Sequence, residues 1–118
     1  MASAIRARAE GGCLVGSFAA RDPLAGAILA EVMPLVFASD PTPHLILIGR
    51  GSETTKALIE SLCPSGAKRL HATGSLDGPG VSHHLAACDL VVQPYPDGIC
   101  TRHSSAMTVL AHGVPMVT

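Results

Sequence analysis

The sequence has few aromatic and few charged residues for its length of 118 residues. It contains no Trp, one Tyr and two Phe, so its core must be built mainly from aliphatic side chains and alanine. Charged residues make up 14% and the formal net charge is -1, which gives no electrostatic basis for binding nucleic acid or an anionic membrane. A chain of 118 residues suits one domain that buries roughly two thirds of its unfolded surface.

The sequence also lacks long apolar runs and recognisable cysteine motifs. No apolar run reaches about 18 residues without a charge or Pro, so no membrane span is expected. The first residues contain Arg but no apolar segment after it, so a cleaved signal is not expected either. The four Cys and six His show no CxxC or other metal-ligand spacing. These absences predict reduced thiols in a cytoplasmic protein, with no metal.

What the sequence does contain is a regular alternation of apolar runs and helix-like segments. The runs that predict buried strands are 13–18, 44–49, 68–74, 90–94 and 114–118. The segments that predict helices are 21–40, 53–63, 81–89 and 104–112. Strands that are apolar on both faces and joined by helices predict an α/β fold, a Rossmann-like parallel sheet with helices on both faces.

Two further expectations concern helix faces and the first residues. The apolar spacing predicts an inward helix face made of Leu24, Ile28, Val32 and Leu35. In the helix over 53–63, capped by Ser52, the residues expected to point inward are Ala57, Leu58 and Leu62. Pro34 is expected to kink or shorten the first of these helices. Residues 1–11 show no such pattern, and we expect a frayed leader or a linker remnant before a domain over 12–118.

Ligands of open parallel sheets bind outside the carboxyl ends of the strands. Four loops are expected at that edge, and they span 17–22, 49–52, 73–76 and 94–104. Gly16, Gly49 and Gly74 stand at or next to three of the strand exits, where glycine allows a ligand to approach the backbone. Ordinary turn chemistry explains the same glycines, and that alternative stays open. GxGxxG and GxxxxGK[ST] motifs are absent, which argues against dinucleotide oxidoreductases and P-loop proteins.

The loop before the last predicted helix is the richest in polar chemistry. A helix that starts near Ser104 presents unpaired N–H groups and the positive end of its dipole. Ser104 and Ser105 add hydroxyl groups, and Arg102 adds a cation that can grip phosphate at two points. This combination predicts a diphosphate site. His103 could donate to the same phosphate or to a sugar hydroxyl, although a solvent-facing His remains an alternative.

The stretch "ACDLVVQPYPDG", followed by "SSAMTVLAHGVPMVT", resembles the C-terminal donor-binding domain of retaining GT-B glycosyltransferases of the family 4 type. "HLILIGRGSE" and "RLHATGSLD" are similar to that family's second strand with its Gly loop and to the strand that brackets the nucleotide base. The resemblance covers roughly residues 12–118. It implies a fragment of a GT-B fold, truncated at its C-terminus, whose N-terminal acceptor domain is missing.

The resemblance further implies a nucleotide-diphospho-sugar as donor, bound without a metal or other cofactor. The base is expected against Thr73, Gly74 and Leu76, and the diphosphate against Arg102 and the first turn of the last helix. The implied donor-binding set is Gly16, Ser17, Gly49, Arg50, Thr73, Gly74, Leu76, Arg102, His103, Ser104, Ser105 and Thr108. The catalytic groups remain unknown.

The sequence departs from the family pattern at its paired glutamates. Thr101 and Thr108 stand where those carboxylates would be, and Thr108 would bind a ribose hydroxyl more weakly than a carboxylate does. Two alternatives therefore stay open beside a glycosyltransferase. One is a non-catalytic, flavodoxin-like binding module, and the other is a GT-B epimerase that acts on a nucleotide-sugar.

Overall fold

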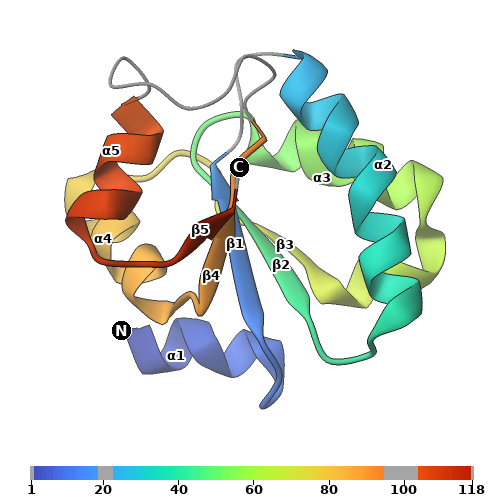
Figure 1. The fold of residues 1–118 in the computed structure, drawn as a ribbon, viewed down its shortest axis with the longest axis horizontal. Helices are drawn as coiled ribbons and strands as arrows, with labels where there is room; N and C mark the ends of the chain where they lie inside the picture. Colours follow the sequence, from blue (N-terminus) through green and yellow to red (C-terminus); the bar gives the residue numbers. More distant parts are fainter. Residues whose placement is uncertain (1, 19–22, 95–103, 118) are drawn as a thin grey trace.

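A computed structural model describes residues 2–18, 23–94 and 104–117 of the chain. Its centre is a parallel sheet of β1 (Leu14–Phe18), β2 (His44–Ile48), β3 (Leu70–Ala72), β4 (Leu90–Val92) and β5 (Met116–Val117) (Figure 1). The α-helices are α1 (Ala2–Arg6), α2 (Pro23–Ser39), α3 (Ser52–Leu62), α4 (Gly78–Ala87) and α5 (Ser104–Ala111). Two 3-10 helices are η1 (Ala7–Ala9) and η2 (Pro64–Arg69). The predicted Rossmann-like α/β sheet is confirmed.

The strand order is β3-β2-β1-β4-β5, and every neighbouring pair is parallel. The ladder between β1 and β2 runs along both strands, from Leu14 opposite His44 to Phe18 opposite Ile48. The ladder between β1 and β4 stops earlier, at Gly16 opposite Val91. The chain builds the sheet outward from β1 to β3 and then returns to the other side of β1, so the winding direction reverses between β1 and β4.

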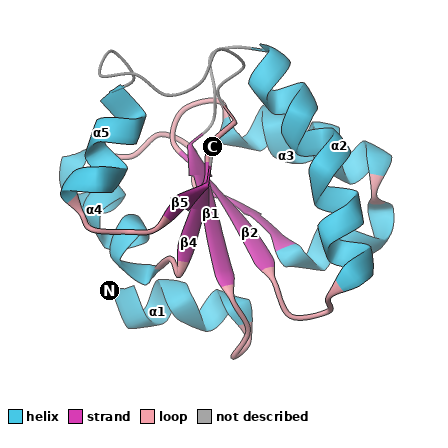
Figure 2. Cartoon of the chain, viewed as in Figure 1, coloured by secondary structure: helices cyan, strands magenta, loops and turns pink. Residues whose placement is uncertain are grey.

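Helices cover both faces of the sheet, and the core lies between them. Figure 2 shows α2 and α3 on one face and α1, α4 and α5 on the other. On the first face Leu45 and Leu47 pack with Met33 of α2 and Ile59 of α3. The second face holds two buried clusters made of Ile5, Ala9, Leu14, Ile46 and Ala87, and of Ile48, Leu85, Val91 and Val109. Phe37 is the one aromatic member of these buried clusters, so the core is otherwise aliphatic, as expected.

The buried faces of α2 and α3 differ in part from the predicted ones. Ile28 is partly buried and Ala57 is exposed, and the burial of Leu24 lies outside the described part of the chain. In α2 the buried residues are Leu29, Ala30, Met33 and Phe37, whereas Val32 and Leu35 are 40% and 69% exposed. In α3 Ile59 is buried, whereas Leu58 and Leu62 are 43% and 59% exposed. Helix α2 is apolar around most of its circumference, so spacing alone offers two stripes of similar quality. Pro34 does not end the helix, which continues to Ser39.

The first residues pack against the domain, and the expectation of a frayed segment is wrong. Ile5 and Ala9 are 4% and 2% exposed, because they pack against Leu14, Ile46 and Ala87. Arg6 Nη1 also lies 2.6 Å from Asp89 Oδ1. Only Ile5 and Ala9 of this segment belong to the buried cluster, which is too few to give residues 1–11 a recognisable apolar periodicity. The predicted boundary of the domain at residue 12 stays a prediction.

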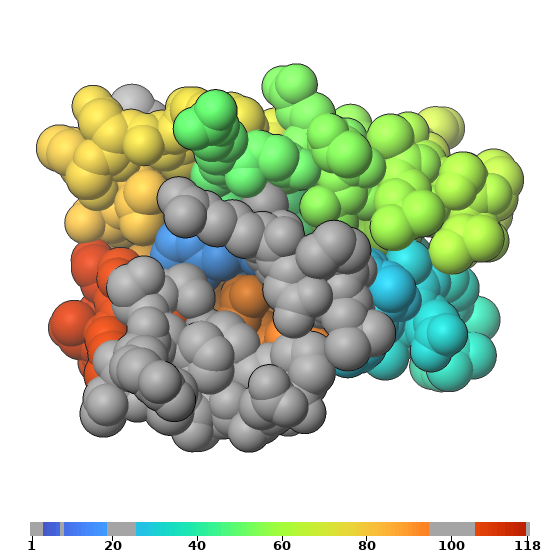
Figure 3. All heavy atoms as spheres, turned by 90° about the horizontal axis from the view of Figure 1, so that it is seen from above, coloured from blue at the N-terminus to red at the C-terminus, as the bar shows by residue number. Residues whose placement is uncertain are grey.

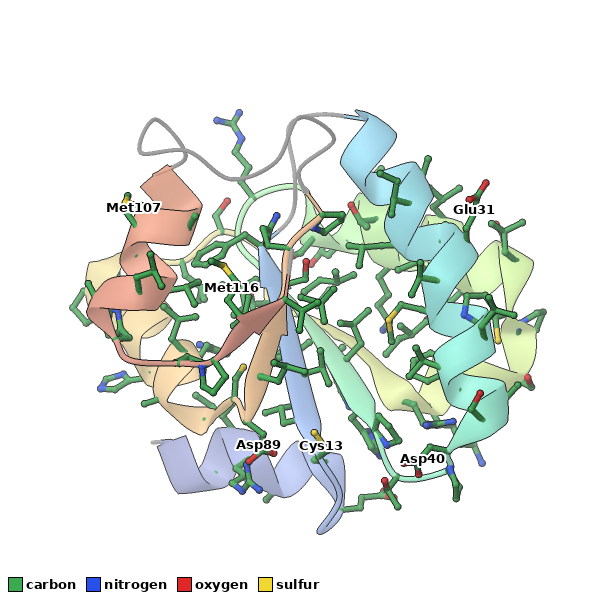
Figure 4. All side chains as sticks on the ribbon, viewed as in Figure 1. Cys13, Glu31, Asp40, Asp89, Met107 and Met116 are labelled. Carbon is green, nitrogen blue, oxygen red and sulfur yellow. The ribbon has the colours of Figure 1, made fainter. Side chains whose placement is uncertain are left out.

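At the amino-terminal edge of the sheet, arginine side chains connect neighbouring segments by hydrogen bonds and an ion pair. Arg69 donates from Nε to Pro43 O at 2.9 Å, from Nη1 to Phe37 O at 2.9 Å, and from Nη2 to Asp40 O. Its guanidinium also lies 4.3 Å from the centre of the Phe37 ring. Asp89 accepts from Arg6 and, at 2.9 Å, from Leu14 N. Figure 4 shows Asp89 and Asp40 along this edge.

The described cysteines are free thiols in different surroundings. Cys13, Cys63 and Cys88 form no disulfide, and Cys100 lies outside the described residues. Burial raises the pKa of Cys88 to about 12, and its Sγ donates to His84 O at 3.3 Å. Burial also raises the pKa of Cys13 above its usual range. Within 2–18, 23–94 and 104–117, no helix has the length and apolar character that crossing a membrane requires.

Candidate functional site

The candidate site lies at the carboxyl-terminal edge of the sheet, where β1 and β4 end side by side. After β1 the chain passes to α2 on one face, and after β4 it passes to α5 on the other. Such a reversal is the place where open α/β sheets form their ligand crevice. Figure 3 looks onto this edge, with blue atoms from the end of β1 next to orange atoms from the end of β4.

Two of the predicted loops are joined directly to each other. Gly49 N donates to Thr73 Oγ1 at 3.0 Å, and Gly74 N donates to Ser52 Oγ at 2.8 Å. Gly49 and Gly74 also form an isolated antiparallel bridge. The structure therefore brings together the predicted residues Gly49, Thr73 and Gly74. The β2–α3 and β3–α4 loops form one braced unit beside the carboxyl ends of β1 and β4.

The glycines of these loops have a backbone reason to be glycine. Gly49, Gly51 and Gly74 have φ values of 99°, 87° and 69°, in the left-handed region that side chains rarely adopt. A Cβ added to Gly49 or Gly51 would meet nothing within 4 Å, so lack of space is not the reason. Turn chemistry therefore explains the positive φ angles. The turns also direct the N–H groups of Gly49 and Gly74 toward Thr73 Oγ1 and Ser52 Oγ.

Ser52 has a different role from the helix cap that the sequence predicts. Gly51 is the N-cap residue of α3, and Ser52 is the first residue of the helix. The Ser52 side chain is fully buried, and its hydroxyl accepts the hydrogen bond from Gly74 N instead of capping α3. Ser52 thus braces two loops, which spacing along one helix cannot reveal.

Gly16 and Ser17 lie inside β1 rather than in the loop that follows it. The expectation that Gly16 stands at the strand exit is wrong, because β1 continues to Phe18. A Cβ on Gly16 would lie 2.7 Å from Cys88 Sγ, so the glycine makes room for that sulfur beneath the sheet. Ser17 is fully buried, and its Oγ donates to Gln93 Oε1 at 3.4 Å.

Gln93 is the residue of this edge that sequence reasoning missed. Its side chain is 2% exposed. Oε1 accepts from Phe18 N at 2.9 Å, and Nε2 donates to Phe18 O at 3.3 Å. The signal in the sequence was an amide at the end of an apolar strand, directly before Pro94.

The N-terminus of α5 faces the same edge. Ser104 and Ser105 form its first turn, as predicted, whereas Arg102 and His103 lie outside the described residues. Thr108 follows one turn later and is partly buried, and its carbonyl accepts from His112 N at 3.2 Å. A helix N-terminus at this position offers backbone N–H groups and a positive dipole end to an anion.

Two remaining predicted residues differ in how firmly they are held. Leu76 is partly buried and packs against the cluster that contains Ile48 and Val109. Arg50 follows Gly49 and is exposed, and its guanidinium has no partner among the described residues. Within the described part of the chain, Arg50 is therefore a cation at this edge without a structural partner.

Comparisons with known proteins find the same architecture in solved structures and no match by sequence. Neither a protein-family model nor a curated protein sequence matches the chain. Solved structures do match, among them an O-GlcNAc transferase mutant from Thermobaculum terrenum, with a TM-score of 0.73 and 20% identity over 92% of this chain. Anabaena HepE in complex with UDP-glucose matches 98% of the chain, with a TM-score of 0.71 and 21% identity. The fold is the Rossmann-like half of a GT-B protein.

A third match is a putative UDP-N-acetylglucosamine 2-epimerase from Listeria monocytogenes. Its TM-score is 0.61, with 16% identity over 96% of this chain. The chain spans 21%, 32% and 29% of the lengths of the transferase, HepE and epimerase structures. At these identities the likeness concerns the fold of one part of each protein.

Proposed function

We propose that the chain is the donor-binding half of a glycosyltransferase of the GT-B fold, and that it binds a nucleotide-diphospho-sugar. The observation that carries this proposal is the braced pair of loops at the carboxyl-terminal edge, beside the reversal point of the sheet, where Gly49 and Gly74 are held by Thr73 and Ser52. Two of the structural neighbours support it, since HepE was solved with UDP-glucose and with UDP and glucose.

The finer parts of the proposal rest on the sequence motifs. The order of the motifs supports a C-terminal donor domain of the family 4 type, which would act together with an N-terminal acceptor domain of the same protein. The reduced cysteines support a cytoplasmic location. Transfer of the sugar to an acceptor requires both domains, so we expect this chain to bind the donor without turning it over.

The electrostatics of the edge suit a diphosphate held without a metal. Thr73, Ser52 and Gln93 are neutral, and each is hydrogen-bonded to backbone groups of the site. Glu53 and Asp77, at the starts of α3 and α4, are the negative groups of this edge. Among the described residues, Arg50 and the N-terminus of α5 are the groups that favour an anionic ligand. Helix N–H groups and an arginine fork both bind phosphate oxygens well. We therefore propose that the site needs neither a metal nor another cofactor.

Binding of the donor is tested by titrating the isotope-labelled chain with UDP-glucose and with GDP-mannose while its amide resonances are followed. We expect shifts at Gly49, Thr73 and Gly74 and in the first turn of α5 when one of the two probes binds. The amide resonances of Arg69 and Asp89, at the opposite edge, serve as internal controls, and their chemical shifts should stay unchanged. Unchanged loop amides at saturating concentrations of both probes would contradict the proposal.

The reaction is tested on a protein in which an acceptor domain precedes this chain. Release of the sugar onto an acceptor supports a glycosyltransferase, whereas an epimerised donor formed without any acceptor supports an epimerase. Arg102→Ala separates both enzymes from a non-catalytic module, because an Arg that grips the diphosphate cannot be removed without loss of activity. Unchanged activity in that variant would contradict the predicted role of Arg102.

A further inference from the structure

Gln93 connects β1 and β4 at the point where their backbone ladder has ended. The ladder stops at Gly16 opposite Val91, and Pro94 has no N–H with which to extend it. The Gln93 amide bonds to both the N–H and the carbonyl of Phe18. A side-chain amide carries the same donor and acceptor as a peptide unit. The side chain of Gln93 therefore extends the connection between the two strands from Gly16 to Phe18, the last residue of β1.

Gln93 also anchors the other side of β4. Its backbone N–H donates to Val117 O of β5 at 2.8 Å. The residue thus ties three neighbouring strands, β1, β4 and β5, at the carboxyl-terminal edge. The same position is the point where the winding of the sheet reverses, and such a reversal opens the ligand crevice of α/β folds.

An amide is a costly choice for a position that is 2% exposed. Leu90, Val91 and Val92 precede it, and another aliphatic residue would fill the space without any polar group to satisfy. An aliphatic side chain could not, however, hold the Phe18 N–H and carbonyl. Phe18 is the last residue of β1 before the chain leaves for α2, so its orientation sets the direction of the backbone at the crevice.

We propose that Gln93 is a positioning residue for the nucleotide-diphospho-sugar, and that it acts through Phe18. It fixes the backbone at the end of β1 in the direction that the bound ligand requires. This inference rests on the proposed donor-binding function. According to this inference, a buried side chain contributes to the affinity for the ligand without touching it.

The first test replaces Gln93 by Met in the 118-residue chain. Met keeps the length of the side chain but removes both hydrogen bonds to Phe18. Calorimetric titration with UDP-glucose and with GDP-mannose should show a Kd for the bound probe that is about tenfold weaker than that of the unchanged chain. Arg69→Met is the control, because it removes hydrogen bonds at the opposite edge, and its Kd should stay within about twofold.

The second test uses pH. A protonated Glu carries one O–H donor and one acceptor, like the amide, whereas an ionised Glu only accepts. In Q93E the carbonyl of Phe18 therefore regains its donor as the carboxyl is protonated. The ratio of the Q93E Kd to the Kd of the unchanged chain should fall from about pH 8 to about pH 5. The same ratio for Q93M should be independent of pH, because Met does not titrate.

The outcomes separate the two proposals. If the unchanged chain binds a probe and Q93M binds it equally well, the role of Gln93 is overturned and the donor-binding function stands. If the unchanged chain binds neither probe, the proposed function fails, and the role of Gln93 fails with it. Should Q93M not fold, the Q93E profile decides, and a Kd ratio that does not change with pH overturns the role.

Discussion

The two edges of the sheet use their polar side chains in opposite ways. At the amino-terminal edge the guanidinium groups are bound to the protein itself, Arg69 to three carbonyls and Arg6 to Asp89. At the carboxyl-terminal edge the neutral side chains of Thr73 and Ser52 brace two loops, and the carboxylate of Asp77 caps α4. The cation of Arg50 has no partner there among the described residues.

This contrast indicates which edge is structural and which is available to a ligand. A charge that already has its hydrogen bonds stabilises the fold but offers little to a passing anion. Hydroxyl and amide groups hold loops in place without adding a charge. The electrostatic potential that a ligand meets is therefore set by the other groups of this edge. Variants at the first edge should therefore change stability, and variants at the second should change affinity as well.

The largest loss of stability is expected from Arg69→Met. The change leaves the carbonyls of Phe37, Asp40 and Pro43 without their donor, and we expect the free energy of unfolding to fall by about 2–3 kcal/mol. Arg69→Lys should recover only part of this loss, since one ammonium cannot reproduce the planar fork. Urea unfolding measures both. Full recovery by Lys would show that charge, rather than the geometry of the fork, closes this edge.

A smaller loss is expected from Gly16→Ala, which lies between the two edges. The new Cβ would meet Cys88 Sγ at 2.7 Å, and overpacking of this kind costs about 1–3 kcal/mol. Cys88→Ala removes the sulfur, so the double variant should lose less than the two single losses combined. A double-mutant cycle by urea unfolding measures this coupling. Simple additivity would mean that the contact with Cys88 is not the reason why Gly16 is required.

At the carboxyl-terminal edge, Ser52→Ala should cost about 1 kcal/mol of stability and also weaken donor binding. The variant removes the acceptor of Gly74 N and so releases the brace between two loops. Ser61→Ala is the matched control on the same helix, because the exposed Ser61 hydroxyl bonds only to Leu58 O of its own helix. Urea unfolding and calorimetric titration are run on both variants. Equal donor affinity of the two variants would remove Ser52 from the site.

The smallest effect is expected from Asp89→Asn, and it should depend on pH. The hydrogen bond from Arg6, and next that from Leu14 N, hold the pKa of the Asp89 carboxyl below its usual range. A lowered folded-state pKa stabilises the fold above the unfolded value, and this contribution is lost as pH falls through the folded value. The difference in unfolding free energy between the unchanged chain and the variant should therefore shrink below about pH 4. A constant difference down to low pH would contradict the ion pair.

The architecture could be predicted from the sequence because its signals are local. Short continuous apolar runs such as "HLILI", between Pro43 and Gly49, indicate strands buried on both faces, and their alternation with helices predicts a parallel sheet. The helix faces were less predictable. Helix α2 offers Leu29 and Met33 on one stripe and Val32 and Leu35 on another, and only the sheet decides between them.

The candidate site was predictable where one loop carries its own signal and not where two loops meet. Gly49 and Gly74 stand out as glycines after strands, and the structure joins them. The roles of Ser52 and Gln93 depend on partners 22 and 75 residues away, Gly74 and Phe18. No spacing along the chain encodes such contacts. The predicted roles of Arg102 and His103 stay predictions, because both residues lie outside the described part of the chain.

The place of β1 between β2 and β4 has a consequence for the order in which the protein is made. Phe18 is synthesised 75 residues before its amide partner Gln93. Closure of so long a loop slows the formation of the contact relative to local structure. A nascent chain on the ribosome would complete β1, α2 and β2 while the crevice is still open on one side. The chain should therefore become able to bind a ligand only after β4 has paired with β1.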